Sequence, residues 1–223
     1  MQVIARVENE FKKKFALPRQ AGLTEGLLST IVFAKEFRVK EALRGLEGYS
    51  HIWLIWGFHD NKKEGWSPTV RPPRLGGNKR MGVFATRSPY RPNPIGLSCV
   101  ELKEIRETKD RGWVLIVSGA DMMDGTPVYD IKPYLPFADS IPDARAGFAG
   151  EHEKDGLQVE CPEEMLRQFS PQEQMTLLSL LSQDPRPHYQ QDENRVYGFP
   201  FAGREVRFRV AGNVLFVCEV TQG

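Results

Sequence analysis

The segment His51–His59 reads HIWLIWGFH and is rich in aromatic and β-branched residues, without alternation of polar and apolar positions. Such a run is typical of a strand that is buried on both faces, as in a closed barrel. His51 is then expected to be an ordinary core or rim histidine. His59 lies at the end of the strand, beside Asp60 and Asn61, and is the better candidate for a ligand contact.

Further short strands are predicted on both sides of this segment, separated by turn residues at roughly ten-residue spacing. They cover residues 3–7, 26–33, 81–86, 95–102, 113–118 and 128–131. Strands do not alternate with helices, and no GxGxxG motif follows a strand, so a Rossmann cofactor site is not supported. The sequence therefore predicts a mainly β fold, a single-sheeted β-barrel, over residues 1–150.

A second, smaller domain is predicted over residues 151–223. Residues 151–164 hold six acidic residues against one lysine, which is typical of a solvated linker or a surface segment. Ser170-Pro171-Gln172-Glu173 combines a serine cap, a proline in the first turn and a glutamate three residues on, which predicts a helix over about 170–182. Three strands are predicted after this helix, over 195–201, 205–210 and 214–220.

Two patterns predict how this small α+β domain packs. Val206, Phe208 and Val210 alternate with Arg207 and Arg209, which predicts a strand with one apolar and one cationic face. The apolar side of the helix is expected to consist of Met175, Leu177, Leu178, Leu180 and Leu181.

The composition limits the class of protein. The 223 residues include 30 Lys and Arg against 29 Asp and Glu, which argues against a general polyanion-binding surface. Cys99, Cys161 and Cys218 form no CxxC pair, so neither a disulfide nor a structural zinc site is expected, and Cys99 and Cys218 are predicted to be core thiols. The N-terminus lacks an apolar signal region and no apolar run is long enough to span a bilayer. We expect a cytoplasmic protein that binds no metal and no membrane.

Residues 65–100 contain six Lys and Arg but no Asp or Glu, and prolines and glycines punctuate them throughout. Proline and glycine hold loops in particular shapes, so this segment predicts a preformed basic site. Arginine binds phosphate or carboxylate in a bidentate manner, and aromatic side chains stack on bases. The residues alone indicate an RNA- or nucleotide-directed site, with Tyr90, Tyr134 and Tyr189 as candidate stacking residues.

Asp121, Asp124 and Asp130 cluster within ten residues. Paired carboxylates of this kind are compatible with acid–base chemistry, and they are equally compatible with ordinary turn and strand-end aspartates. The sequence leaves both interpretations open.

Five motifs, in order over residues 17–140, resemble the TsaA-like family, whose characterised bacterial members are tRNA (N6-threonylcarbamoyladenosine(37)-N6)-methyltransferases. The motifs are PRQAGL at 18–23, RPPRLGGN at 71–78, GVFATRS at 82–88, RPNPIGLS at 91–98, and DGTP with DIKPY at 124–134. DPRP with a tyrosine, at 184–189, resembles the C-terminal extension of the bacterial members. The chain departs from the family pattern at Val3–Asn9, where a Ser-Pro-Tyr turn is usual, and at Asp60, where a neutral amide is usual.

The resemblance implies a single closed barrel that works as a homodimer, with S-adenosylmethionine bound near the subunit interface. It implies methyl transfer to the exocyclic nitrogen of the modified adenosine beside the anticodon of tRNA. Asp130 is expected to act as the general base, with His59 as the second candidate.

The resemblance also implies two sets of binding residues. The cofactor is expected to contact Pro18, Arg19, Gln20, Ala21, Gly22, His59, Asp60, Arg87, Arg91, Leu97, Gly125, Thr126, Pro127 and Val128. The tRNA is expected to contact Arg71, Arg74, Lys79, Arg80, Asp184, Arg186 and Tyr189. Two alternatives are a non-catalytic RNA-binding barrel and a barrel that binds only a small molecule.

Overall fold

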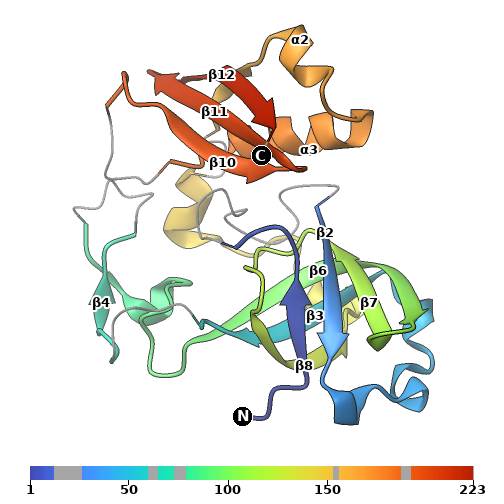
Figure 1. The fold of residues 1–223 in the computed structure, drawn as a ribbon. Coiled ribbons are helices and arrows are strands. Elements are labelled where there is room, and N and C mark those ends of the chain that lie inside the picture. The colour runs from blue at the N-terminus through green and yellow to red at the C-terminus, as the bar shows by residue number, and fades with distance from the viewer. Residues whose placement is uncertain (13–26, 60–64, 73–78, 153–155, 187–191, 223) are drawn as a thin grey trace.

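The structure is a computed structural model and describes residues 1–12, 27–59, 65–72, 79–152, 156–186 and 192–222. It is mainly β, as the sequence predicts, and consists of a ring of strands below a smaller α/β unit (Figure 1). No helix formed by the described residues is long and apolar enough to cross a membrane.

The lower unit is a closed barrel of six antiparallel strands in the order β1-β2-β7-β6-β3-β8. The ring closes because β8 pairs with β1, where Ala5 lies opposite Val128 and Arg6 opposite Pro127. The strands are β1 (Ala5–Glu8), β2 (Leu28–Phe33), β3 (His51–Gly57), β6 (Ile95–Thr108), β7 (Gly112–Ser118) and β8 (Pro127–Pro133).

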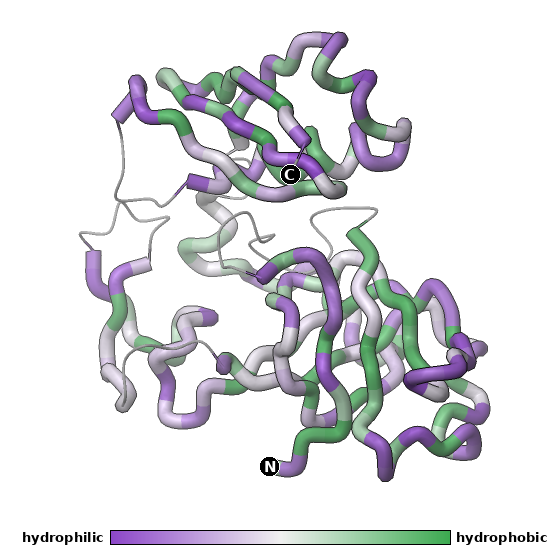
Figure 2. The backbone as a smooth tube through the Cα atoms, viewed as in Figure 1, coloured by the Kyte–Doolittle hydropathy of each residue, from purple (hydrophilic) through white to green (hydrophobic). Residues whose placement is uncertain are grey.

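The interior of the barrel is filled by alternate residues of its strands. Ile31, Ile52, Leu54 and Leu115 are completely buried there. The prediction that β3 is buried on both faces is wrong. Burial alternates along β3, and His51 is exposed, because the second face of this strand forms the outside of the barrel. In Figure 2 the barrel strands β2 and β7 are largely hydrophobic, whereas the turn between β6 and β7 is hydrophilic.

The segment that joins β3 to β6 leaves the barrel, so the strand predicted over 81–86 is mostly wrong. Only β5 (Met81–Gly82) is extended, and it pairs with β4 (Thr69–Val70) in a small ribbon. The 3-10 helix η5 (Val83–Ala85) follows, and its turn is stabilised because the hydroxyl of Thr86 donates to the carbonyl of Val83 over 2.9 Å.

The remaining helical segments are short apart from one. They are η1 (Lys35–Phe37), η2 (Lys40–Leu43), η3 (Leu46–Gly48), α1 (Pro136–Asp139), η6 (Gly147–His152), α2 (Glu163–Leu166) and α3 (Pro171–Ser182). The start of α3 is the predicted one: the backbone N–H of Glu173 donates to Ser170 Oγ over 3.4 Å, and that of Ser170 to the Glu173 carboxylate over 2.7 Å.

The C-terminal sheet has the order β10-β11-β12-β9, with β9 (Gln158–Glu160), β10 (Tyr197–Phe201), β11 (Arg204–Ala211) and β12 (Val214–Gln222). The three predicted C-terminal strands are confirmed. The solvated linker is wrong in part, because β9 lies within it and pairs parallel to β12.

Helix α3 covers the inner face of this sheet. Val206, Phe208 and Val210 are fully buried against Leu177 and Leu181, which confirms the apolar face of β11. Two apolar predictions are wrong, because Met175 is 59% exposed on the outer side of α3 and Cys218 is exposed at a bulge of β12.

The outer face of the sheet carries the two predicted arginines, and both have partners on β12. The Arg207 guanidinium donates to the carboxylate of Glu219 over 3.0 Å, and Arg209 lies 4.5 Å from the centre of the Phe216 ring. The charge of Arg207 is therefore paired with a carboxylate, whereas Arg209 keeps its positive charge over an aromatic ring.

The C-terminal unit rests on one end of the barrel. Phe11 and Leu27 belong to its hydrophobic core, although they flank β1 and β2 in the chain. The backbone N–H of Ala202 donates to the Glu10 carboxylate over 3.2 Å. We call the end where β1 and β3 finish and β6 and β8 begin the upper end of the barrel.

Candidate active site

The loop Asp121–Thr126 is held at the upper end by the residue that follows β1. Asn9 Nδ2 donates to the carbonyl of Met122 over 2.8 Å and to Ser29 Oγ over 3.1 Å. The backbone N–H of Asn9 donates to the Asp124 carboxylate over 3.1 Å. Residues 3–9 depart from the family pattern, but the Asn9 side chain in this segment still fixes the turn.

Gly125 and Thr126 are anchored from β1. The backbone N–H of Gly125 donates to the Val7 carbonyl over 2.8 Å, and an Arg6 guanidinium N–H donates to the Gly125 carbonyl over 2.9 Å. Gly125 has φ of 76°, a left-handed conformation that glycine adopts without strain. A hollow of about 580 Å³ adjoins Gly125 and is lined by side chains of both charges, including Arg6, Lys12 and Asp124.

His59 lies beside this loop. Its Nδ1 is 3.4 Å from the hydroxyl of Thr126, a side chain that is only 1% exposed. The backbone N–H of Phe58 donates to the carbonyl of Pro94 over 3.0 Å, which ties the end of β3 to the loop before β6. The structure thus brings His59, Thr126 and the end of the Arg87–Ile95 loop together.

The Arg87–Ile95 loop is held by its own hydrogen bonds. An Arg91 guanidinium N–H donates to the carbonyl of Thr86 over 3.3 Å. The backbone N–H groups of Ser88 and Tyr90 each donate to a hydroxyl two residues earlier. Arg87 is exposed at the start of this loop. The loop is therefore shaped locally, as its prolines predict.

Two predicted cofactor residues face away from a common site within one chain. Val128 is completely buried in the barrel core, so its side chain cannot contact a bound cofactor. Leu97 is 56% exposed on the outside of β6. Pro127, which precedes Val128 at the start of β8, is also buried.

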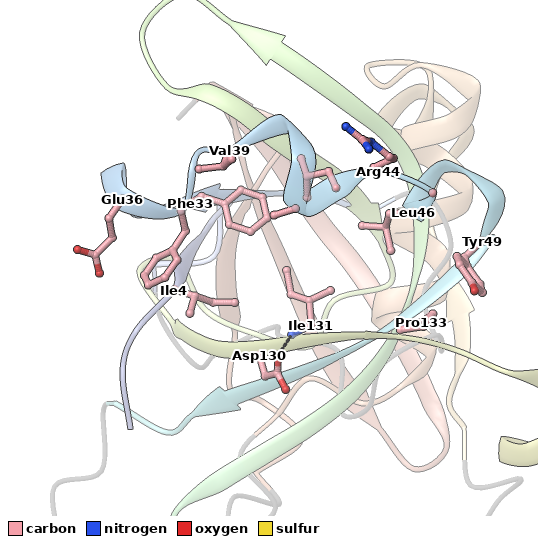
Figure 3. Close-up of a pocket in the computed structure, with 14 residues that line it drawn as sticks. Ile4, Phe33, Glu36, Val39, Arg44, Leu46, Tyr49, Asp130, Ile131 and Pro133 are labelled. Atoms are coloured by element: carbon pink, nitrogen blue, oxygen red, sulfur yellow. Dashed lines mark hydrogen bonds between the residues drawn. The ribbon is translucent and has the colours of Figure 1, made fainter.

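Asp130 is separated from His59. It lines a different cavity, of about 490 Å³, at the opposite end of the barrel, together with residues of β2 and of the helical segments after it (Figure 3). Its carboxylate accepts the backbone N–H of Ile131 over 2.9 Å and lies 3.3 Å from Lys132 Nζ. The two candidate bases therefore do not form one catalytic pair within a chain.

Two family models match this chain. The one described as the tRNA-methyltransferase O N-terminal domain matches residues 6–140, and the one described as the TrmO C-terminal domain matches residues 154–223. The chain belongs to the tRNA-methyltransferase O family.

A named relative and a solved TrmO structure each match nearly the whole of this chain. The tRNA (adenine(37)-N6)-methyltransferase of Escherichia coli (strain K12) is 44% identical over 226 residues, covering 97% of this chain and 96% of that protein. A Pseudomonas aeruginosa protein named putative S-adenosylmethionine-dependent methyltransferase RcsF is 43% identical over 203 residues, covering 87% and 85%. The crystal structure of TrmO from Pseudomonas aeruginosa superposes with a TM-score of 0.74 at 34% identity, covering 99% of this chain and 98% of that one. The chain is thus a tRNA methyltransferase of the TrmO family.

Several predicted residues of this TrmO-family chain lie outside the described residues. They are Pro18, Arg19, Gln20, Ala21, Gly22, Asp60, Arg74 and Tyr189. Within the described ranges, no group of three or more His, Cys, Asp or Glu side chains is placed to hold a metal ion.

The candidate tRNA residues differ in how accessible their charges are. Arg71, Lys79 and Arg80 are exposed beside the β4–β5 ribbon, which projects from the barrel in Figure 1. Arg186 instead donates two hydrogen bonds to the carboxylate of Asp184, at 2.8 and 3.0 Å, and its side chain is only 15% exposed. The Asp184–Arg186 pair therefore stabilises its own loop. The positive charge of Arg186 is largely neutralised by the Asp184 carboxylate.

Two of the cysteines, Cys99 and Cys161, are poor nucleophiles. Burial, and secondarily the nearby Asp139 carboxylate, raise the pKa of the Cys99 thiol, and burial raises the pKa of the Cys161 thiol. A raised pKa keeps a thiol protonated and unreactive at neutral pH.

Sequence reasoning missed two parts of the upper end. One is Asn9, which the sequence marked only as a departure from the family. The other is a chain of two hydrogen bonds from Trp56 through Ser98 to Asp121, of which the first is buried. The RPNPIGLS motif contained Ser98, but nothing in the sequence identified which side chain it would meet.

Proposed function

We propose that this protein transfers a methyl group from S-adenosylmethionine to N6 of the adenosine at position 37 of tRNA, and that this adenosine carries the N6-threonylcarbamoyl group. The observation that carries the proposal is the grouping of His59, Thr126 and the Arg87–Ile95 loop at the upper end of the barrel. The name of the Escherichia coli relative supports the position and the nitrogen. The threonylcarbamoyl group is supported by the resemblance in the motifs.

The side chains at the upper end fit the proposed cofactor. S-adenosylmethionine carries a carboxylate, an ammonium and a sulfonium, so it needs donors for an anion and acceptors for cations. Arg87 and Arg91 are suited to the carboxylate, and the hollow beside Gly125 is lined by side chains of both charges. When bound, the cofactor supplies an electrophilic methyl group.

The chain must orient N6 of the adenosine and accept its proton. The N6 lone pair is delocalised into the purine and the carbamoyl carbonyl, so the proton must leave as the N–CH₃ bond forms and the S–CH₃ bond breaks. We assign this proton to His59 rather than Asp130, because His59 lies at the same end as the arginine loop. Positioning and the local electrostatic environment then account for most of the catalysis.

A second copy of the chain is part of this proposal. Phe84 is 74% exposed, Leu97 56% and Trp66 53%, on the segments that join β3 to β6 and on β6 itself. Large apolar side chains that are exposed in this way are typical of a protein–protein interface. A homodimer would cover them and would complete the cofactor site around Leu97.

The proposal also assigns a role to each domain and a location in the cell to the protein. In the proposal, residues 1–150 form the barrel domain that binds the cofactor, and residues 151–223 form a domain that supports tRNA binding. Asp184 and Arg186 contribute by holding the loop that leads to Tyr189. A tRNA substrate and three cysteines without a disulfide support a cytoplasmic location.

The modified nucleoside is tested with two tRNA preparations. The protein is incubated with labelled S-adenosylmethionine and with tRNA that bears or lacks the threonylcarbamoyl group, and methyl incorporation is measured. We expect incorporation only into the modified tRNA. Equal incorporation into both would contradict the modified substrate, cofactor binding without transfer would favour a non-catalytic RNA-binding barrel, and absence of cofactor binding would favour a small-molecule barrel of another kind.

The basic ribbon is expected to contact tRNA phosphates. Replacing Arg71, Lys79 and Arg80 together with alanine should lower tRNA affinity about 10-fold or more, because fewer counterions are released when the tRNA binds. The log–log slope of affinity against salt concentration should flatten by about one unit for each phosphate that is no longer neutralised. The measurement is tRNA binding by the full chain as a function of salt concentration.

The matched control removes the same charge from the opposite end of the barrel. Lys103, Arg106 and Lys109 are exposed near the turn between β6 and β7, and their triple alanine variant should leave the salt slope unchanged. The same slope in both triple variants would show that the ribbon has no particular role.

A further inference from the structure

A chain of two hydrogen bonds, the first buried and the second partly buried, leads from the barrel interior to the upper end. Trp56 Nε1 donates to Ser98 Oγ over 2.9 Å, and the Ser98 hydroxyl donates to Asp121 Oδ1 over 2.6 Å. Trp56 is 7% exposed and Ser98 is 2% exposed. Because Ser98 accepts from the indole, its own proton points to Asp121, and the short distance is typical of a hydrogen bond to a charged carboxylate.

Trp56, the first residue of this chain of hydrogen bonds, is held in place by its neighbours. Gly96 lies opposite Trp56 in the pairing of β3 with β6, and a Cβ atom at Gly96 would collide with the indole ring. The Phe58 ring packs against the indole with a centroid distance of 4.4 Å. Trp56 is thus fixed between Gly96 and Phe58, and it fixes the rotamer of Ser98 in turn.

Asp121, the last residue of this chain of hydrogen bonds, begins the loop that approaches His59. Asp121 precedes Met122, which is 1% exposed and whose carbonyl accepts from Asn9 over 2.8 Å. The loop ends at Thr126, whose hydroxyl is 3.4 Å from His59 Nδ1. Ser98 and Asn9 therefore hold the first part of this loop from two sides, one from inside the barrel and one from the end of β1.

We propose that Ser98 and Asp121 are positioning residues for methyl transfer, which act by fixing the loop Asp121–Thr126 and, through Thr126, His59. The inference rests on the proposed function, because it assigns these residues to the same site. A hydroxyl buried between an indole and a carboxylate is suited to this role, since removing it deprives each of these groups of one hydrogen bond.

The test compares Ser98→Ala with Ser118→Ala in the full chain. Ser118 is a matched control, because it is also a buried barrel serine, 5% exposed, and it does not belong to the chain of hydrogen bonds from Trp56 to Asp121. Ser98→Ala should lower kcat/KM for S-adenosylmethionine about 10-fold, as expected when a misplaced group disturbs a reacting geometry. Ser118→Ala should leave kcat/KM unchanged, and Ser98→Thr, which keeps the hydroxyl, should restore most of it.

A second readout does not depend on activity. Hydrogen exchange of the backbone amides in residues 121–126 should become faster in Ser98→Ala than in the unsubstituted chain, and should not change in Ser118→Ala. If Ser98→Ala fails to fold, Asp121→Asn serves instead, because it keeps an acceptor for Ser98 but loses the charge that strengthens the hydrogen bond.

The outcomes separate this inference from the proposed function. Unchanged exchange in residues 121–126, or a loss of kcat/KM that Ser118→Ala shares, would overturn the positioning role. Absence of methyl transfer by the unsubstituted chain would overturn the proposed function, whatever the substituted chains do.

Discussion

Replacing Arg87 with alanine is expected to weaken S-adenosylmethionine binding about 100-fold, because a bidentate hydrogen-bonded pair of charges contributes about 3 kcal/mol. Arg87 is exposed at the start of the loop that precedes β6, and it lies outside both hydrophobic cores. The fold should therefore persist. The measurement is calorimetric titration of the full chain with the cofactor, beside a thermal unfolding curve of the same sample.

The control for this variant is Arg106→Ala. Arg106 is an exposed arginine of β6 near the opposite end of the barrel, where it donates to the Glu104 carboxylate over 2.8 Å. It should bind the cofactor as the unsubstituted chain does. Normal cofactor binding by Arg87→Ala would show that the arginine loop does not hold the carboxylate.

The barrel could be predicted because its strands are signalled locally. Apolar runs such as 113–118 and turn signals such as Asp124-Gly125 fix where strands begin and end. The error at β3 has a physical reason: the outer face of a barrel strand also bears aromatic residues where neighbouring segments cover it, as Tyr134 and Asp139 cover Trp53. Composition alone cannot separate this arrangement from burial inside a core.

Elements whose partners are distant in sequence were harder to predict. Strand β9 has only three residues and exists because β12, more than fifty residues later, offers an edge with which it can pair. The ribbon of β4 and β5 likewise depends on a pairing rather than on a pattern. In both cases the hydrogen bonds come from tertiary structure, which local propensity does not describe.

The candidate site shows the same division. The motif that carries Thr126, and His59 at the end of its strand, were predicted from sequence, and the structure brings these two residues together at one end of the barrel. The sequence could not show that Asp130 lines the opposite end, or that the charge of Arg186 is paired with Asp184. These facts depend on which way a strand residue points and on which partner lies within reach.

Replacing His59 with alanine is expected to lower kcat about 100-fold or more, the range typical for loss of a general base. His59 is exposed just after β3, so the unfolding temperature should change little, and turnover is measured at saturating cofactor. His51→Ala is the matched control, because His51 is an exposed histidine at the other end of the same strand, with its Nδ1 2.9 Å from Ser50 Oγ. It should keep normal turnover.

Chemical rescue distinguishes a base from a structural side chain at this position. Added imidazole should restore part of the activity of His59→Ala, because it can occupy the vacated space and accept the proton from N6, and it should not change His51→Ala. The His59→Gln variant keeps a polar group beside Thr126 but cannot act as a base, so it should be as inactive as His59→Ala. Full activity of His59→Gln would mean that the hydrogen bond to Thr126, rather than proton transfer, is what the reaction requires of this residue.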